Sequence, residues 1–311
     1  TLMHEVGHVL GLRHNFRASR VYSEAQLADP EFTRLNGTTG SVMEYNAINL
    51  PRPGQRGGTP FQATLGPYDP IAYAAKRLEI ARDLFLRQER RELKPDQSYA
   101  VLRRSLAYAI ADAGRAVGVL VRQIGGVRTL RDHPGSGRDP LKPTDAATQR
   151  QALALIAHNV LSIDSLAVTP ALQRRLVPDF DDRAANPALP TDYPVPQRLL
   201  ELQRSVLNQL MSDTVAARIL DNVGKTDRPD QAFQLSELYA RLNRDIWTEL
   251  GKGGNISATR RELQRDHVNR VAGTLVRPGP QTRADARSLL RVQAVELQAQ
   301  LDKALKRQND M

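Results

Sequence analysis

The chain has 311 residues, of which 41% are hydrophobic and 25% charged, an ordinary composition for a globular protein. It contains no cysteine, which excludes disulfides, thiolate catalysis and cysteine-ligated zinc. The net charge of +10 admits an anionic partner. No run of basic residues reaches roughly five or six, however, so a solvated arginine-rich surface is the simpler interpretation. No stretch is apolar for long enough to predict a membrane-spanning helix.

The chain is expected to begin with a helix over residues 1 to about 14, followed by a turn. Its apolar face is predicted from residues at helical spacing, namely Leu2, Met3, Val6, Val9 and Leu10. Gly11 is expected to end the helix, because glycine readily takes the positive φ of a helix C-cap. A short helix is expected within Ser23–Leu35. Residues 49–66 are rich in proline and glycine, which predicts a long surface loop rather than a packed element.

Beyond residue 69 the pattern is overwhelmingly helical. Asp69 and Pro70 predict a helix start, with Asp69 as N-cap and Pro70 at the first helical position. Apolar spacing predicts helices near residues 70–92, 96–124, 144–163, 196–221, 231–250, 257–276 and 281–307. Residues 125–130 are expected to form a short strand or extended arm, and the proline-rich residues 180–196 a linker. We therefore expect a mainly α fold, with the chemistry in residues 1–66 and an all-helical region over residues 67–311.

The chemistry is concentrated between residues 4 and 14, which hold three of the six histidines. Four residues separate His4 from His8, so a helix presents both imidazoles on one face. A sharp exit from the helix lets His14 return to the same ion. Three imidazole nitrogens with an open fourth position are typical of a catalytic zinc site. Glu5 lies beside the ligands, where it can take a proton from water without binding the metal itself.

Incidental surface histidines on a helix are the alternative interpretation, but the full spacing makes coincidence remote. The three histidines elsewhere in the chain (His133, His158 and His267) stand singly, and each is expected to be structural or on the surface. Three imidazoles suit zinc, although cobalt or nickel could replace it in vitro.

A second motif, Ser41-Val42-Met43-Glu44-Tyr45, follows the histidines. The extended histidine motif and this methionine turn together resemble the metzincin metalloproteases. The resemblance implies that Met43 lies beneath the zinc ligands as an apolar base. It also implies that Tyr45 contacts the zinc or the transition-state oxyanion. The alternatives are that Met43 only fills the core and that Tyr45 is a buried tyrosine bonded to a carbonyl.

Further segments resemble a bacterial group of large, Met-zincin-like zinc metalloproteases with long helical C-terminal regions. They are residues 14–16, 41–46, 66–69, 131–135 and 246–250. Asn15, directly after the third histidine, differs from the residues typical of the best-known metzincin branches. The resemblance runs through most of the chain. It implies Zn²⁺ as cofactor, a protein or peptide as substrate, and a secreted or periplasmic location.

The expected reaction is hydrolysis of a peptide bond. Glu5 would take the proton of the attacking water and pass it to the departing amine, while Tyr45 would help to stabilise the oxyanion. The histidine motif begins at His4, almost at the first residue of the sequence, so we expect a fragment that lacks the substrate-binding sheet of a metzincin. Such a fragment would leave the apolar face of the first helix uncovered and would hydrolyse peptides poorly.

Two other functions stay open. The chain could be a helical protein-binding or scaffold module that carries an inactive protease remnant. A nucleic-acid binder is suggested by the charge alone, and because no known binding motif is present we expect no nucleic-acid partner.

Overall fold

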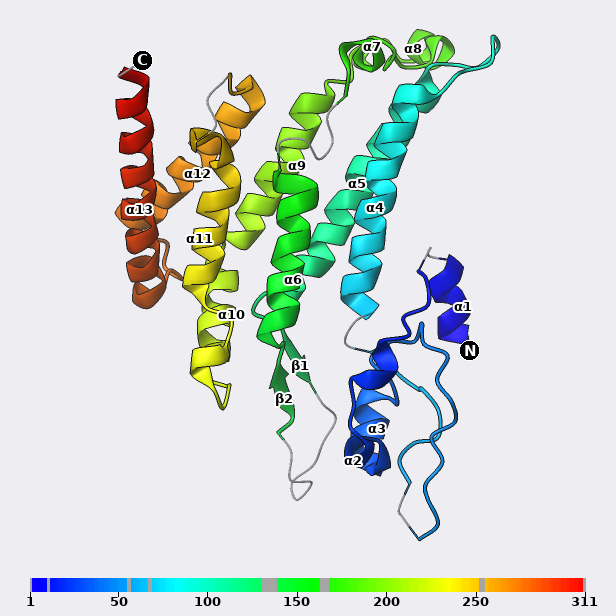
Figure 1. Cartoon of the computed structure of the whole chain (residues 1–311). Coiled ribbons are helices and arrows are strands. Elements are labelled where there is room, and N and C mark those ends of the chain that lie inside the picture. The colour runs from blue at the N-terminus through cyan, green and yellow to red at the C-terminus, as the bar shows by residue number, and fades with distance from the viewer. Residues whose placement is uncertain are drawn as a thin grey trace. The chain divides into compact units, whose positions relative to one another are not determined.

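The computed structural model describes residues 2–9, 12–54, 57–66, 69–129, 139–162, 168–251 and 255–309 (Figure 1). These residues form thirteen α-helices and one two-stranded sheet, so the fold is mainly α, as the sequence predicts. The chain divides into two compact units. Unit 1 is Thr1–Arg77 with Arg128–Lys142, and unit 2 is Leu78–Val127 with Pro143–Met311. The domain boundary expected between residues 66 and 67 stays a prediction.

Unit 1 is built from short helices and long connections. Its helical elements are α1 (Leu2–Val9), a 3₁₀ turn η1 (Ala18–Arg20), α2 (Glu24–Ala28), α3 (Pro30–Asn36) and the first turns of α4 (Asp69–Arg90). The single helix expected within Ser23–Leu35 is in fact two. The break falls at Asp29, whose carboxylate caps α3 by accepting from the N–H groups of Glu31 and Phe32. Pro30 then opens α3, where its missing N–H costs nothing.

The described residues between α3 and α4 contain no helix or strand, which agrees with the surface loop predicted for residues 49–66. Parts of this loop nevertheless pack closely. The Gln62 side chain accepts from the N–H groups of Thr38 and Thr39 and donates to the carbonyl of Thr64. A Cβ on Gly58 would lie 2.2 Å from the carbonyl oxygen of Leu27. Local composition predicted the irregular backbone but not these long-range contacts.

The strand expected within residues 125–130 is present as β1 (Val127–Thr129). It pairs with β2 (Leu141–Pro143), which the sequence did not predict. Three segments named in the sequence lie partly or wholly outside the described residues: the helix end at Gly11, Pro67 and Tyr68 before α4, and residues 131–135 with His133.

Unit 2 consists of packed helices (Figure 1). After the rest of α4 it contains α5 (Ala100–Gln123), α6 (Ala146–Ile156), a π-helical turn η2 (Ala157–Leu161), α7 (Pro170–Gln173), α8 (Phe180–Ala185), α9 (Val195–Leu210), α10 (Asp213–Val223), η3 (Pro229–Gln231), α11 (Leu235–Ile246), η4 (Thr248–Gly251), α12 (Ala258–Val276) and α13 (Ala284–Asn309). Helix α5 packs against α6 and α9, α12 packs against α9 and α13, and α11 packs against α13. Burial of apolar side chains stabilises this unit; Leu120, Leu200 and Leu207 are fully buried.

Two expectations for unit 2 are corrected. The helix predicted over residues 196–221 is divided into α9 and α10, because the Ser212 side chain accepts from the N–H of Val215 and caps a new helix. The stretch predicted as a linker begins with the short helix α8, which is capped by Asp179. No described helix is both long and apolar enough to cross a membrane.

Candidate metal centre

Helix α1 supplies His4, Glu5 and His8. The two histidines are four residues apart and so share one face of the helix. The N–H of Leu12 donates to the carbonyl of Gly7 at 2.9 Å, so Leu12 lies beside the end of this helix. His14 lies against the face that carries the other two imidazoles.

The Nε2 atoms of the three histidines converge on one point. They lie 3.1 Å apart between His4 and His8, 3.0 Å between His8 and His14, and 3.2 Å between His14 and His4. A tetrahedral zinc ion with nitrogen ligands at roughly 2.0–2.1 Å holds those nitrogens about 3.3 Å apart. Within the described residues, this is the group of histidine and acidic side chains close enough together to share an ion.

The other ring nitrogens decide which atoms are free to bind a metal. Nδ1 of His4 donates to the carbonyl of Val42 at 2.8 Å, and Nδ1 of His8 donates to the carbonyl of Leu12 at 3.0 Å. A carbonyl can only accept, so each Nδ1 carries the proton and each Nε2 presents a lone pair. Lone pairs this close repel one another unless a cation lies between them. The donor set therefore fits a metal ion.

Met43 lies directly against α1. Its side chain is 1% exposed, and a Cβ on Gly7 would lie 2.2 Å from the Met43 sulfur. Only glycine at position 7 allows the methionine to approach the helix this closely. The sequence reasoning missed Gly7, although a glycine inside a helix costs stability and often marks a packing requirement.

The segment after His14 is tied to the same turn as Met43. The N–H of Asn15 donates to the carbonyl of Met43 at 2.9 Å. The carboxylate of Glu44, itself 8% exposed, accepts from the N–H of Ser19 at 3.1 Å. Residues 41–44 therefore contact the segments that carry the first and third histidines. The part played by Glu44 was not predicted from the sequence.

Tyr45 lies beside the histidines. Its ring centroid is 4.1 Å from that of His14 and 5.2 Å from that of His4. The side chain is 67% exposed, unlike the buried structural tyrosine considered as the alternative. Phe16, which is also exposed, lies 5.5 Å from the ring of His14.

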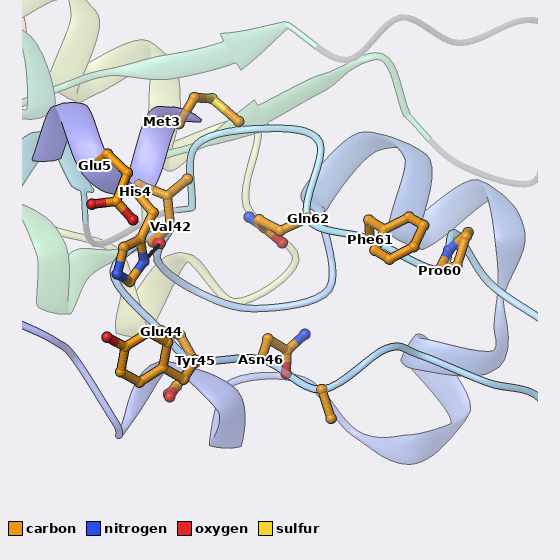
Figure 2. A pocket seen from close by; sticks show the side chains of 11 residues that line it. Met3, His4, Glu5, Val42, Glu44, Tyr45, Asn46, Pro60, Phe61 and Gln62 are labelled. Atoms are coloured by element: carbon orange, nitrogen blue, oxygen red, sulfur yellow. Dashed lines mark hydrogen bonds between the residues drawn. The ribbon is translucent and has the colours of Figure 1, made fainter. Parts of the chain in front are cut away.

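A cavity of about 240 Å³ opens beside His4. It is lined by α1, by residues 42 and 44–47, and by residues 60–62. Figure 2 shows the carboxylate of Glu5 next to the His4 ring, with Tyr45 on the opposite side and Gln62 and Phe61 further along the cavity. Glu5 and Tyr45 thus border the same space. Leu2, Val6 and Val9, predicted as the apolar face of this helix, are exposed.

Asp69 stands at the start of α4, as predicted, but its carboxylate bonds other partners than an N-cap would. Helix α4 begins at Asp69 itself, which is 4% exposed. Within the described residues its carboxylate accepts from the Ser41 hydroxyl at 2.5 Å, the Val42 N–H at 3.1 Å and the Gly66 N–H at 2.7 Å. These bonds replace the predicted N-cap bond to the first turn of α4, because the donors are brought together by tertiary packing.

Of the histidines expected to be structural or on the surface, two are described. His158 is exposed on η2, and His267 is buried on α12. Nδ1 of His267 accepts from the indole N–H of Trp247 at 3.1 Å, and Glu249 pairs with the buried Arg260 at 2.8 Å. The motif at residues 246–250 therefore holds helices of unit 2 together.

Three imidazoles converge, and two of them come from the helix that also carries Glu5, so these residues form a candidate zinc site. The sequence model of the Met-zincin family matches residues 1–74 and 69–254. Because the match covers most of the chain, this chain belongs to the Met-zincin family. No curated protein and no solved structure matches it.

Proposed function

We propose that this chain carries the catalytic centre of a zinc-dependent endopeptidase, with His4, His8 and His14 as the zinc ligands. The observation that carries the proposal is the approach of three Nε2 atoms to within 3.2 Å of one another. The carbonyl partners of His4 and His8 support it, since they leave the Nε2 lone pairs free. Membership of the Met-zincin family is consistent with this function.

Glu5 is the general base in this proposal. Zinc, when bound, supplies a Lewis acid that acidifies water and polarises the scissile carbonyl. Glu5 lies one residue after His4, borders the cavity and is exposed, so its carboxylate is free to take a proton from water. It then returns that proton to the departing amine nitrogen. Tyr45, close to His4 and His14, donates its hydroxyl proton toward the oxyanion.

Met43 is the apolar base of the site. Its sulfur fills the space over Gly7 and keeps water from the underside of the histidines. The cavity beside His4 is of a size to receive one amino-acid side chain, which supports a protein or peptide as the substrate. By its resemblance to secreted metzincins, we propose that the enzyme acts outside the cytoplasm.

Metal analysis and peptide hydrolysis test the proposal together. Mass spectrometry of the metal content should find about one zinc per chain, and a chelator should remove both zinc and hydrolysis of casein. Glu5→Gln should keep the zinc and lower turnover by roughly 10²–10⁴-fold, because it removes the base and leaves the ligands in place. His8→Ala should lose the zinc.

His158→Ala is the matched control, since His158 is an exposed histidine of unit 2 and should affect neither zinc nor turnover. A zinc-loaded Glu5→Gln variant with full activity would overturn the assignment of the base. Because the chain is expected to hydrolyse peptides only slowly, the assay uses long incubation with the chelated protein as blank. A wild-type chain that binds zinc tightly yet shows no hydrolysis above that blank would favour the scaffold with an inactive protease remnant.

A further inference from the structure

The contacts that hold His4 in place lead to one buried carboxylate, that of Asp69. His4 donates through Nδ1 to the carbonyl of Val42, and the N–H of the same Val42 donates to Asp69. A single residue therefore links the imidazole to the carboxylate. The orientation of the His4 ring depends on where the Val42 backbone is held.

The neighbouring residues are held by the same carboxylate. The Ser41 hydroxyl donates to Asp69 at 2.5 Å and accepts from the N–H of Met43 at 3.0 Å. The Gly66 N–H completes the set at 2.7 Å. Gly66 packs so tightly that a Cβ there would lie 1.9 Å from the carbonyl oxygen of Gly40. Asp69 thus joins the turn at residues 41–43 to the chain that enters α4.

A carboxylate suits this position because three donors point at it. An ionised aspartate only accepts, and its two oxygens offer about four lone-pair sites. Hydrogen bonds to a charged acceptor are also about twice as strong as those between neutral groups. Without Asp69, the Ser41 hydroxyl and the N–H groups of Val42 and Gly66 would be buried with no acceptor, and the turn would have to move.

We infer that Asp69 is a positioning residue for the metal centre, acting through Val42 on His4 and through Ser41 on Met43. This inference rests on the proposed zinc site but not on peptide hydrolysis. Asp69 makes no hydrogen bond to the three histidines and is not itself among the residues that line the cavity. Its effect is on the affinity and geometry with which the three histidines hold a metal.

The test is zinc affinity, measured by competition with a chromophoric chelator, for the wild-type chain and three variants. Asp69→Ala should weaken zinc binding about 10–100-fold, the effect typical of losing a partner outside the ligand shell. Asp69→Asn should recover most of the affinity, to within about 3-fold of wild type. Its amide oxygen can accept from Val42 and Gly66 while its NH₂ donates to the Ser41 hydroxyl.

Thr33→Val is the matched control in unit 1. Thr33 is fully buried, and its hydroxyl donates to the carbonyl of Asp29 and accepts from the N–H of Thr59. Its loss should lower the melting temperature without changing the zinc affinity of the folded protein. Should Asp69→Ala fail to fold, Ser41→Ala carries the test, with an expected loss of about 3–10-fold because one of the two links is kept.

The cobalt-substituted proteins give a second readout that does not depend on turnover. The visible d–d absorption of Co²⁺ should shift in Asp69→Ala and return toward the wild-type spectrum in Asp69→Asn. Unchanged affinity and spectrum in a folded Asp69→Ala variant would overturn the inference, as would an equal loss in Thr33→Val. A wild-type chain that binds zinc but hydrolyses nothing would refute only the proposed function, whereas one that binds no metal would refute both.

Discussion

His4 and His8 each use both ring nitrogens, one toward the shared centre and one toward a backbone carbonyl. The second bond is as important as the first, because it fixes the tautomer and the plane of the ring. Tyr45 differs from them. It has an exposed ring in contact with His14, so its hydroxyl can be removed without disturbing the ligands.

Tyr45→Phe should therefore lower kcat by roughly 10–100-fold while zinc content and KM stay near wild type, because one donor to the oxyanion is lost. The measurement is steady-state hydrolysis of a fluorogenic peptide alongside metal analysis. Tyr108→Phe is the control, since Tyr108 is an equally exposed tyrosine on α5. An unchanged kcat in Tyr45→Phe would leave the tyrosine without a catalytic role.

His267 gives a prediction about pH. Burial lowers the pKa of His267 from 6.5 to about 4, and the nearby Arg270 acts in the same direction. Between about pH 6.5 and pH 4 the unfolded chain binds a proton that the folded chain does not. The free energy of unfolding should therefore fall by as much as about 3 kcal/mol as the pH drops through this range, with no such change above pH 6.5.

Urea unfolding followed by Trp247 fluorescence measures this directly, since Trp247 is the single tryptophan and bonds His267. A chelator is present throughout, so that release of metal at low pH does not contribute to the measured change in the free energy of unfolding. His267→Gln, which keeps a hydrogen-bond acceptor, should show a weaker pH dependence than wild type. Equal slopes for the two proteins would contradict the assigned pKa.

At the scale of single residues, part of the candidate site could be predicted from the sequence. The three histidines, Glu5, Met43 and Tyr45 could be named because their spacing is local and belongs to a known motif. Asp69 was misread as a helix cap, since its partners at Ser41 and Val42 are brought to it only by folding. The roles of Gly7 and Glu44 also depend on contacts across the fold, which no local pattern encodes.

At the scale of elements, helix α1 and the turn at residues 41–45 pack against each other beneath the histidines. The turn passes close under the helix only because Gly7 has no side chain. Met43 is almost fully buried and cannot withdraw without moving other groups. Substitutions at this contact should therefore affect the metal centre and the stability of unit 1 together.

Gly7→Ala should destabilise unit 1 by about 1–3 kcal/mol and weaken zinc binding, because the added methyl overlaps the Met43 sulfur. Gly118→Ala is the control. Gly118 lies within α5 and a Cβ there meets nothing within 4 Å, so alanine should be neutral or stabilise by up to about 1 kcal/mol. Thermal unfolding of both variants measures the change in stability, and zinc titration measures the change in zinc affinity. A Gly7→Ala protein as stable as wild type would show that the Met43 side chain can move away from the helix at little cost in stability.

The limits of sequence prediction are visible in the elements too. Long amphipathic helices such as α5 and α11 were found, because their apolar faces repeat over several turns. Breaks inside a predicted helix were missed where a polar cap interrupts an otherwise continuous pattern, as at Asp29 and Ser212. The strand β2 (Leu141–Pro143) was missed because it has none of the β-branched residues that begin and end β1.

At the scale of the molecule, the chain combines a site-bearing unit poor in regular structure with a helical unit stabilised by its own core. A metal that binds only the folded state stabilises the part that binds it. Zinc removal should therefore loosen unit 1, whose helices are short, far more than unit 2.

Amide hydrogen exchange with and without chelator measures this difference. Exchange should rise over residues 2–9 and 12–46 on zinc removal, and it should change little in α5, α9 and α11, whose buried leucines need no ligand. Equal deprotection of both units would mean that the metal holds the whole chain together. No change in either unit would indicate that the histidines do not share an ion.

X-ray absorption at the zinc edge of the zinc-loaded protein tests the metal centre most directly. The chain has no cysteine, so no thiolate ligand can contribute to the spectrum. The account predicts three imidazole nitrogens at roughly 2.0–2.1 Å with one further light atom, and loss of one imidazole in His14→Ala. A spectrum with fewer than three imidazoles, or one that His14→Ala leaves unchanged, would contradict it.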